Sequence, residues 1–305
     1  MNSRLIPTSG GINLFLTYSD MPEPDAETIL FIHGYPDTQI SWQRQMDYFR
    51  KKYRVAAFDT RGSGKSSSPI DRSGYSANEL TNDVQTVIDF LVGKEGKVHL
   101  VGHDWGSIIS WTFLSTGENQ KRVFSFSAVT CPHPMMFYRN VFGKLFSLEP
   151  NRIAEGGSQL VRSFYILLFQ LPFLPEFLWE TFTKEIWSII LEQGDIPEDD
   201  PMRKLTPEEI LARTKNSVNL YREAMQGGVV PLPKNPFDVP ISVFIPEDDV
   251  VLTPELYDGM ESYVKNLKTY RIQANHWVHK ERPDWFNKSL EEFLKFSVRG
   301  KSKTQ

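Results

Sequence analysis

The chain has 305 residues, a formal net charge of −4 and 40% hydrophobic residues, among them 21 Phe and 7 Trp. This composition allows a sizeable buried core, and the lack of any long run of like charge argues against nucleic acid as a partner. The single cysteine, Cys131, excludes an intramolecular disulfide and favours a reducing compartment.

The most apolar segment, residues 164–179, is interrupted by two prolines, a glutamine and a glutamate. It is therefore too short and too broken to span a bilayer. Residues 1–4 lack the charged and apolar pattern of a signal peptide. We expect a cytoplasmic protein that has no membrane partner.

The first 130 residues alternate short apolar runs with amphipathic stretches. The runs expected to form strands are residues 12–18, 28–32, 54–58, 98–101 and 123–129. Between them, two sets of residues fall on one face of a helix: Trp42, Met46 and Phe49, and then Leu80, Val84, Val87, Ile88 and Leu91. This alternation predicts an α/β fold with a mostly parallel sheet and helices on both faces.

After residue 130 the pattern changes. Residues 131–230 contain no run typical of a strand and are rich in Phe, Leu and Trp, which predicts several helices. Thr206-Pro207-Glu208-Glu209 has the pattern of a capping box, and Gly227-Gly228 indicates the end of a helix. Strands are expected again at residues 240–245 and near 269–272. A final helix follows, with an apolar face made of Phe286, Leu290, Phe293 and Leu294.

These boundaries predict three parts. Residues 1–130 form the first part of the α/β core, residues 131–231 a helical cap, and residues 232–305 the second part of the core. Residues 300–305 are expected to be disordered.

The motif Gly102-His103-Asp104-Trp105-Gly106 lies between an expected strand and an expected helix. This is the context of a nucleophile elbow, where glycines on both sides of the nucleophile permit a sharp turn. Asp104 stands in the position of the usual serine. A carboxylate that attacks a saturated carbon forms an ester, which water can hydrolyse, whereas a serine would form an ether. Asp104 is therefore the candidate nucleophile for epoxides or haloalkanes, and the alternative is an ordinary Asp in a turn.

Enzymes with this elbow present nucleophile, acid and histidine in that order along the chain. Glu247-Asp248-Asp249 follows one expected strand, and Asn275-His276-Trp277 follows the next. We predict that His276 activates water and that Asp249 orients its ring. Glu247 and Asp248 remain alternatives for the acid, and His279 remains an alternative base.

His33-Gly34-Tyr35-Pro36 ends an early strand, and its turn is expected to place the N–H of Tyr35 beside that of Trp105 as an oxyanion hole. The alternative is a simple turn before a helix. Residues 62–66, Gly-Ser-Gly-Lys-Ser, look like a phosphate-binding loop, but Asp59 stands where that motif needs a glycine. We therefore do not expect nucleotide binding.

Together these motifs resemble those of the epoxide hydrolases of the α/β-hydrolase superfamily, over nearly the whole chain. The matching segments are the four around Tyr35, Asp104, Asp249 and His276, together with residues 59–64, Asp-Thr-Arg-Gly-Ser-Gly. The resemblance implies an α/β-hydrolase fold with an inserted helical cap. It also implies hydrolysis of an epoxide to a vicinal diol with neither a cofactor nor a metal.

The family also carries two cap tyrosines that hydrogen-bond the epoxide oxygen. The resemblance places one at Tyr165, in a Tyr-x-x-x-Phe-Gln-x-Pro segment, and the other at Tyr221, in an Asn-Leu-Tyr-Arg segment. Each shares an expected helical face with apolar residues, so a purely structural role is the alternative. For Tyr165 these residues are Val161, Phe164 and Leu168, and for Tyr221 they are Val218 and Met225.

An apolar pocket is expected beside the nucleophile, lined by Pro36, Trp105, Leu168, Phe169 and Trp277. In one departure from the family pattern, Asn275 stands where a glycine usually precedes the catalytic histidine.

Three functions remain open at this point. The first is an epoxide hydrolase that forms an ester on Asp104, which water activated by His276 then hydrolyses. The second is a haloalkane or haloacid dehalogenase with the same nucleophile, and the third is a non-catalytic ligand receptor. The tyrosines favour the first, because a departing epoxide oxygen needs a proton and a halide does not. A small apolar epoxide is the expected substrate. The sequence leaves open whether the chain forms a homodimer.

Overall fold

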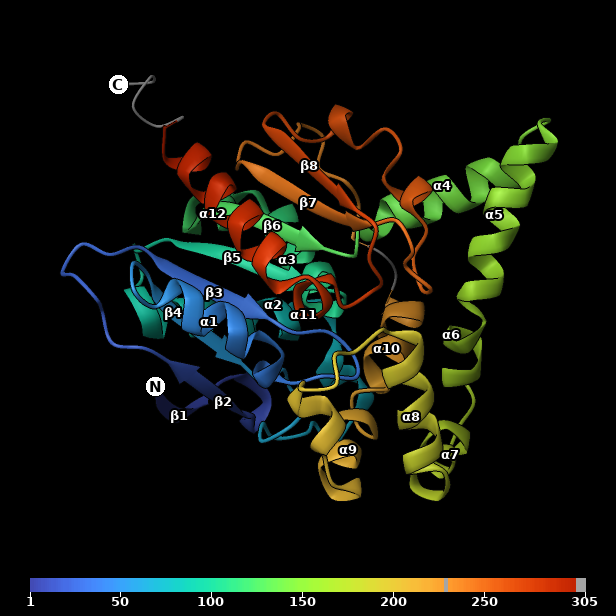
Figure 1. Ribbon diagram of the computed structural model, residues 1–305, viewed down its shortest axis with the longest axis horizontal. Helices are drawn as coiled ribbons and strands as arrows, with labels where there is room; N and C mark the ends of the chain where they lie inside the picture. Colours follow the sequence, from blue (N-terminus) through green and yellow to red (C-terminus); the bar gives the residue numbers. More distant parts are fainter. Residues whose placement is uncertain (228–229, 300–305) are drawn as a thin grey trace.

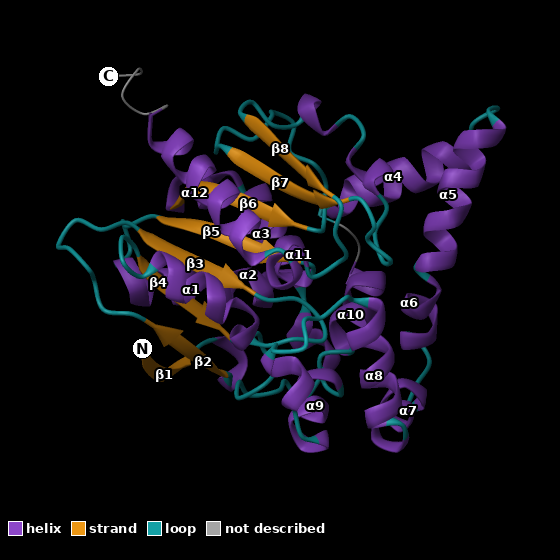
Figure 2. Ribbon diagram, in the orientation of Figure 1, coloured by secondary structure: helices purple, strands orange, loops and turns teal. Residues whose placement is uncertain are grey.

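The computed structural model describes residues 1–227 and 230–299. Its centre is an eight-stranded sheet with the strand order β1-β2-β4-β3-β5-β6-β7-β8 (Figures 1 and 2). β1 and β2 pair antiparallel, as do β2 and β4, and the other neighbours are parallel. The strands are β1 Asn2–Pro7, β2 Asn13–Tyr18, β3 Thr28–Ile32, β4 Arg54–Phe58, β5 Val98–His103, β6 Val123–Val129, β7 Ile241–Pro246 and β8 Leu267–Ile272.

Helices cover both faces of the sheet, as expected from the sequence. Leu30 and Ile32 of β3 join a hydrophobic cluster with α2 (Ala77–Val92) and α3 (Trp105–Ser115). Ile29 and Phe31, which point the other way, join a second cluster with α1 (Gln43–Phe49) and α12 (Pro283–Arg299). Because successive side chains of a strand point to opposite faces, a strand buried on both faces is continuously apolar. This explains why β3 was recognisable from its sequence.

Strand β1 was not expected from the sequence. Of its six residues only Ile6 is buried. It lies at the edge of the sheet and pairs only with β2. An exposed edge strand needs neither an apolar run nor a regular alternation, so it leaves no periodic signal.

Between β6 and β7 the described residues form helices and no named strand. We call residues 134–227 the cap (Figure 1). The capping box at Thr206 is confirmed, because its side chain accepts from the N–H of Glu209 while the Glu209 carboxylate accepts from the N–H of Thr206. The cap helices are α4 Pro134–Leu145, α5 Pro150–Arg162, α6 Phe164–Phe169, α7 Leu174–Thr181, α8 Thr183–Gln193, α9 Pro207–Thr214 and α10 Asn219–Gly227.

Helix α10 ends at Gly227, and the second glycine of the expected stop, Gly228, lies outside the described residues, as do residues 300–305. The final helix, α12, buries Phe286, Leu290, Phe293 and Leu294 as expected. No helix in the described part of the chain is long and apolar enough to cross a membrane.

The cap lies beside the edge of the sheet at which the parallel strands end. In Figure 2 the arrowheads of β3, β5 and β7 point toward the cap helices. Loops that follow parallel strands meet at this edge, which is where open α/β sheets usually bind their ligands. The loops after β3, β5, β7 and β8 carry the candidate residues.

Candidate active site

Asp104 lies at a sharp turn between β5 and α3. Its backbone has a positive φ, with φ at 50° and ψ at −117°, a conformation that residues with a side chain rarely adopt. The turn requires the glycines on both sides. A Cβ at Gly102 would overlap the backbone of Gly106, and a Cβ at Gly106 would overlap the carbonyl oxygen of Ile32. The elbow predicted from the motif is therefore present, and a side chain at either flanking position would disrupt it.

The carboxyl group of Asp104 is buried, with 6% of the residue exposed. Its Oδ1 accepts a hydrogen bond of 2.8 Å from the N–H of Tyr35, and the N–H of Trp105 also donates to the carboxyl group. Burial raises the pKa of Asp104, while the charge of His276 and the two backbone N–H groups oppose that rise. The two N–H groups of the expected oxyanion hole therefore both contact the carboxyl group of Asp104.

His276 lies between two carboxylates. Its Nδ1 is 2.8 Å from Oδ2 of Asp249, and its Nε2 is 3.8 Å from Oδ2 of Asp104. Burial on its own would lower the pKa of His276, but the charge of Asp249 and the hydrogen bond to it raise the pKa above its usual value. Asp249 is itself fixed, because its Oδ1 accepts from the N–H groups of Val251 and Leu252.

The alternative acids and the alternative base lie elsewhere. Glu247 is exposed and accepts a hydrogen bond from the side chain of Gln273, and Asp248 is also exposed. His279 stacks on the ring of Trp42 at 4.3 Å between centroids, and its Nε2 lies 2.9 Å from Oγ of Ser41. Burial lowers the pKa of His279 well below its usual value. Of these candidates, the geometry brings Asp249 and His276 together with Asp104.

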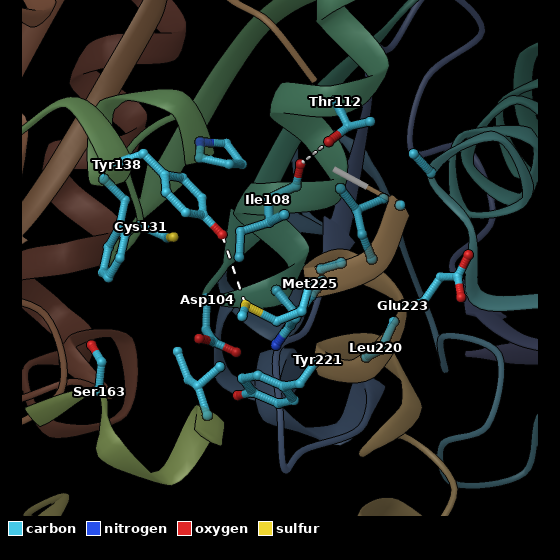
Figure 3. A pocket seen from close by; sticks show the side chains of 18 of the residues that line it. Asp104, Ile108, Thr112, Cys131, Tyr138, Ser163, Leu220, Tyr221, Glu223 and Met225 are labelled. Carbon is cyan, nitrogen blue, oxygen red and sulfur yellow. Dashed lines mark hydrogen bonds between the residues drawn. The ribbon is translucent and has the colours of Figure 1, made fainter. Parts of the chain in front are cut away.

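A cavity of about 630 Å³ opens above Asp104, with walls formed by α3, the start of α2, the loop after β7 and the cap. Figure 3 shows the side chains of Asp104 and Tyr221 at this cavity. Tyr165 also lines it, together with apolar residues such as Ile108 and Phe137. The site can therefore hold an apolar molecule against the carboxylate.

Of the residues expected to line the pocket, only Trp105 does so. Pro36, Leu168, Phe169 and Trp277 are not on the wall of this cavity, which corrects that expectation. The ring of Phe169 packs edge-on against Tyr35 and Tyr221, behind the wall. The ring of Trp277 packs against Gly194 and beside His103. Their packing partners lie far away in the sequence, so the motifs alone did not indicate this placement.

Several lining residues were not expected from the sequence. They include Ser76 and Asn78 at the start of α2, and Tyr138 of α4. The hydroxyl of Tyr138 lies 3.9 Å from the sulfur of Met225, a contact that joins α4 to α10 across the cavity (Figure 3). No motif marks these positions, because α2, α4 and α10 meet only in the folded chain.

Tyr165 of α6 and Tyr221 of α10 bring two phenol groups to the cavity. Their ring centroids are 5.8 Å apart, and Tyr221 also packs edge-on against Trp105 at 5.0 Å. Burial raises the pKa of both phenols, so they are protonated over the whole physiological range. Each can therefore donate a hydrogen bond to an oxygen in the cavity.

The expected apolar face around Tyr165 is not a core face. Val161 is 72% exposed and Phe164 is 65% exposed, whereas Tyr165 lines the cavity. Helix α6 begins only at Phe164, so Val161 belongs to the preceding helix, α5. Because the two helices are separate, Val161 and Tyr165 do not share the continuous helical face that was expected from the sequence.

The segment that resembles a phosphate-binding loop is organised by side chains of the protein. The carboxylate of Asp59 accepts from the N–H groups of Gln39 and Lys65, both at 2.8 Å. Arg61 is buried and forms a two-point ion pair with Asp83, with both hydrogen bonds at 2.7 Å. Within this loop the carboxylate of Asp59 therefore accepts the N–H of Lys65, and the N–H groups of Gly62 and Gly64 donate to backbone carbonyl oxygens.

Comparison with known proteins gives one family model, described as the alpha/beta hydrolase fold, which matches residues 27–155. The chain is similar to epoxide hydrolase 4 of Homo sapiens, at 28% identity over 90% of this chain and 74% of that protein. It is also similar to epoxide hydrolase 3 of Xenopus tropicalis, at 30% identity over 88% of this chain and 71% of that protein.

Among solved structures, the Bacillus megaterium epoxide hydrolase in complex with an inhibitor matches with a TM-score of 0.77. The match covers 96% of this chain and 100% of that chain, at 24% identity. At this identity the structural likeness establishes the fold alone.

Proposed function

The chain belongs to the epoxide hydrolase family of the α/β-hydrolase superfamily, and we propose that it opens epoxides to vicinal diols through an ester on Asp104. One observation supports this proposal above all others. A buried carboxylate at a strained elbow faces a cavity that two protonated phenols line, and a histidine paired with an acid lies 3.8 Å from that carboxylate.

In the first step, Oδ2 of Asp104 attacks a ring carbon of the epoxide. We assign Oδ2 because Oδ1 accepts the N–H of Tyr35. A C–O bond forms to Asp104, the ring C–O bond breaks, and its electron pair moves to the departing oxygen. That oxygen takes a proton from Tyr165 or Tyr221, which becomes a phenolate and regains a proton through solvent when the Asp104 carboxyl group is restored in the second step. Phenols kept neutral by burial suit this role, because an alkoxide is a poor leaving group without a proton.

In the second step, His276 takes a proton from water, and the resulting hydroxide attacks the carboxyl carbon of Asp104. The negative charge then develops on Oδ1, which accepts the N–H of Tyr35, while the N–H of Trp105 also donates to this carboxyl group. The intermediate collapses, the bond from the carboxyl carbon to the ester oxygen breaks, and the diol leaves with the proton held by His276. The new Asp104 carboxyl group then releases its own proton, which restores the carboxylate and balances the proton that the phenolate regains. Asp249 stabilises the charge of His276 while it holds that proton.

The substrate that the cavity suits is an apolar epoxide. The lining of the cavity is mostly aliphatic and aromatic. The polar side chains that interact with Asp104 are the two phenols and the His–Asp pair. A dehalogenase would use the same nucleophile, but it would not need a proton donor for its leaving group. The paired phenols therefore favour the epoxide.

The proposal can be tested by the origin of the diol oxygen. In a single turnover of excess enzyme in heavy-oxygen water, the first diol should carry no label, because its new oxygen comes from Asp104. The label should enter the Asp104 carboxylate and reach diol only in later turnovers. Label in the first diol would mean direct attack by water and would refute the covalent mechanism.

A second test traps the ester. In His276→Gln, ester formation should proceed while hydrolysis stops, so the intact protein should gain the mass of one substrate molecule. Asp104→Ala treated in the same way serves as the matched control and should gain none. Equal mass gain in both variants would show that another residue is alkylated.

A further inference from the structure

The cap contacts the loop that carries His276 at the end of helix α8. Gly194 packs against the indole ring of Trp277, and a Cβ at Gly194 would lie 2.6 Å from Cε3 of that ring. The next residue, Asp195, has a left-handed backbone with φ at 49°. Close packing and this turn together bring residues 193–195 of the cap beside Asn275 and His276.

The side chain of Asn275 makes four hydrogen bonds at this contact. Its Nδ2 donates to the carbonyl oxygen of Gln193 at 2.6 Å and to the carboxylate of Asp195 at 2.9 Å. Its Oδ1 accepts from the N–H of His276 at 2.8 Å and from the N–H of Val250 at 3.2 Å. A buried amide has two donors and two acceptor sites, and here all four are used.

These hydrogen bonds connect three parts of the chain. One oxygen atom holds the backbone of His276 and the backbone that follows Asp249, and so sets the spacing of the two loops whose side chains meet at 2.8 Å. The nitrogen of the same amide connects both loops to the cap. Five residues further on, a buried ion pair between Lys280 and Asp200 joins the cap to the helix after His276.

We propose that Asn275 is a positioning residue for ester hydrolysis. Through its side chain, residues 193–195 of the cap hold His276 at hydrogen-bonding distance from Asp249. The inference deepens the proposed function and rests on it. It assigns a role to the position where the family pattern has a glycine, which has no side chain to make these contacts. Ester formation uses Asp104 and the phenols, so Asn275 acts on the second step and not on the first.

The test measures the two steps separately in single-turnover experiments with an apolar epoxide such as styrene oxide. Ester formation is followed by fluorescence of Trp105, and ester hydrolysis by loss of the alkylated enzyme in intact-protein mass spectra. In Asn275→Gly, ester formation should keep the parental rate. Hydrolysis should slow by about 10- to 100-fold, the cost of misplacing a catalytic group by about 1 Å. The ester should therefore accumulate at steady state.

Two variants of the cap residue Asp195 test the same contact without changing Asn275, in case Asn275→Gly folds poorly. Asp195→Gly removes one of the four hydrogen bonds and tolerates the left-handed backbone, so it should slow hydrolysis by about 2- to 10-fold, the value of one hydrogen bond. Asp195→Asn keeps an acceptor for Asn275 and should restore the parental rate. Gln273→Ala, which removes an exposed hydrogen bond two residues from Asn275, is the matched control and should change neither step.

Unchanged hydrolysis in both Asn275→Gly and Asp195→Gly would overturn the inference, and so would equal slowing of the two steps. If the parental protein forms no ester with any epoxide, the proposed function itself fails. If the parental protein forms and hydrolyses the ester but the variants show no selective effect, only the role of Asn275 fails.

Discussion

Removing the two cavity phenols should greatly slow ester formation while the nucleophile and the His–Asp pair stay intact. Tyr→Phe removes only the hydroxyl group, and the ring contacts of Tyr221 with Tyr35, Trp105 and Phe169 remain available. Each single variant loses one hydrogen bond to a developing negative charge, so ester formation should slow by about 10- to 100-fold. Because the two rings are 5.8 Å apart, the remaining phenol can still serve as the proton donor.

The double variant, Tyr165→Phe with Tyr221→Phe, should lose the whole contribution of the general acid, ~10²–10⁴-fold in rate. Stopped-flow fluorescence measures the effect, because Trp105 lies next to the nucleophile. Tyr138→Phe provides a control, since Tyr138 lines the same cavity but contacts Met225. Ester formation at the parental rate in the double variant would show that these tyrosines are structural, and the dehalogenase interpretation would then be preferred.

Three further predictions follow from the same geometry. Asp104→Ala should abolish diol formation, and diol formation at a near-parental rate in this variant would exclude Asp104 as the nucleophile. Asp104→Asn should recover activity slowly as water converts the amide to the acid, which mass spectrometry would show as a gain of about 1 Da. Hydrolysis needs neutral His276, so its rate should fall as the pH drops through the raised pKa of His276. Asp249→Asn removes the main cause of that raised pKa, so it should move the decline in rate to lower pH and slow hydrolysis. A pH profile that does not move would contradict the assigned His–Asp pair. Asp83→Ala leaves Arg61 buried without its two-point partner and should lower the free energy of unfolding by about 3–5 kcal/mol in urea denaturation; a loss below about 1 kcal/mol would mean that Glu79 and backbone carbonyls suffice for the guanidinium.

Local chemistry alone was enough to predict much of this protein. The inner strands, such as β3 and β5, could be predicted because strands that are buried on both faces are apolar along almost their whole length. The elbow was predictable from five residues, because Gly102 and Gly106 are required by close approach and Asp104 follows β5 directly. Asp249 and His276 were among few candidates, because each follows a strand that ends at the same edge of the sheet.

The choice among neighbouring candidates depended on the folded chain. Glu247, Asp248 and Asp249 are adjacent in sequence, yet only Asp249 is buried and turned toward His276. His279 is three residues from His276, but it lies in the short helix Val278–Glu281 and stacks on Trp42. Three consecutive side chains in a loop point in different directions, and neither periodicity nor residue type indicates which one faces a partner 27 residues away.

The walls of the cavity and the contacts of the cap were set by tertiary structure alone. Phe169 and Trp277 have the residue types of a pocket wall but pack against other aromatic rings, whereas Tyr138 and Met225 meet across the cavity from α4 and α10. Asn275 was a departure from a family pattern in the sequence and is a four-fold hydrogen-bonding residue in the structure. Periodicity and motifs record how a segment relates to its own neighbours in the chain. The cavity and the cap contact arise where segments far apart in the sequence converge, such as those of Tyr138 and Met225 or of Gln193 and Asn275. The direction and distance between such segments are defined only once the core has packed.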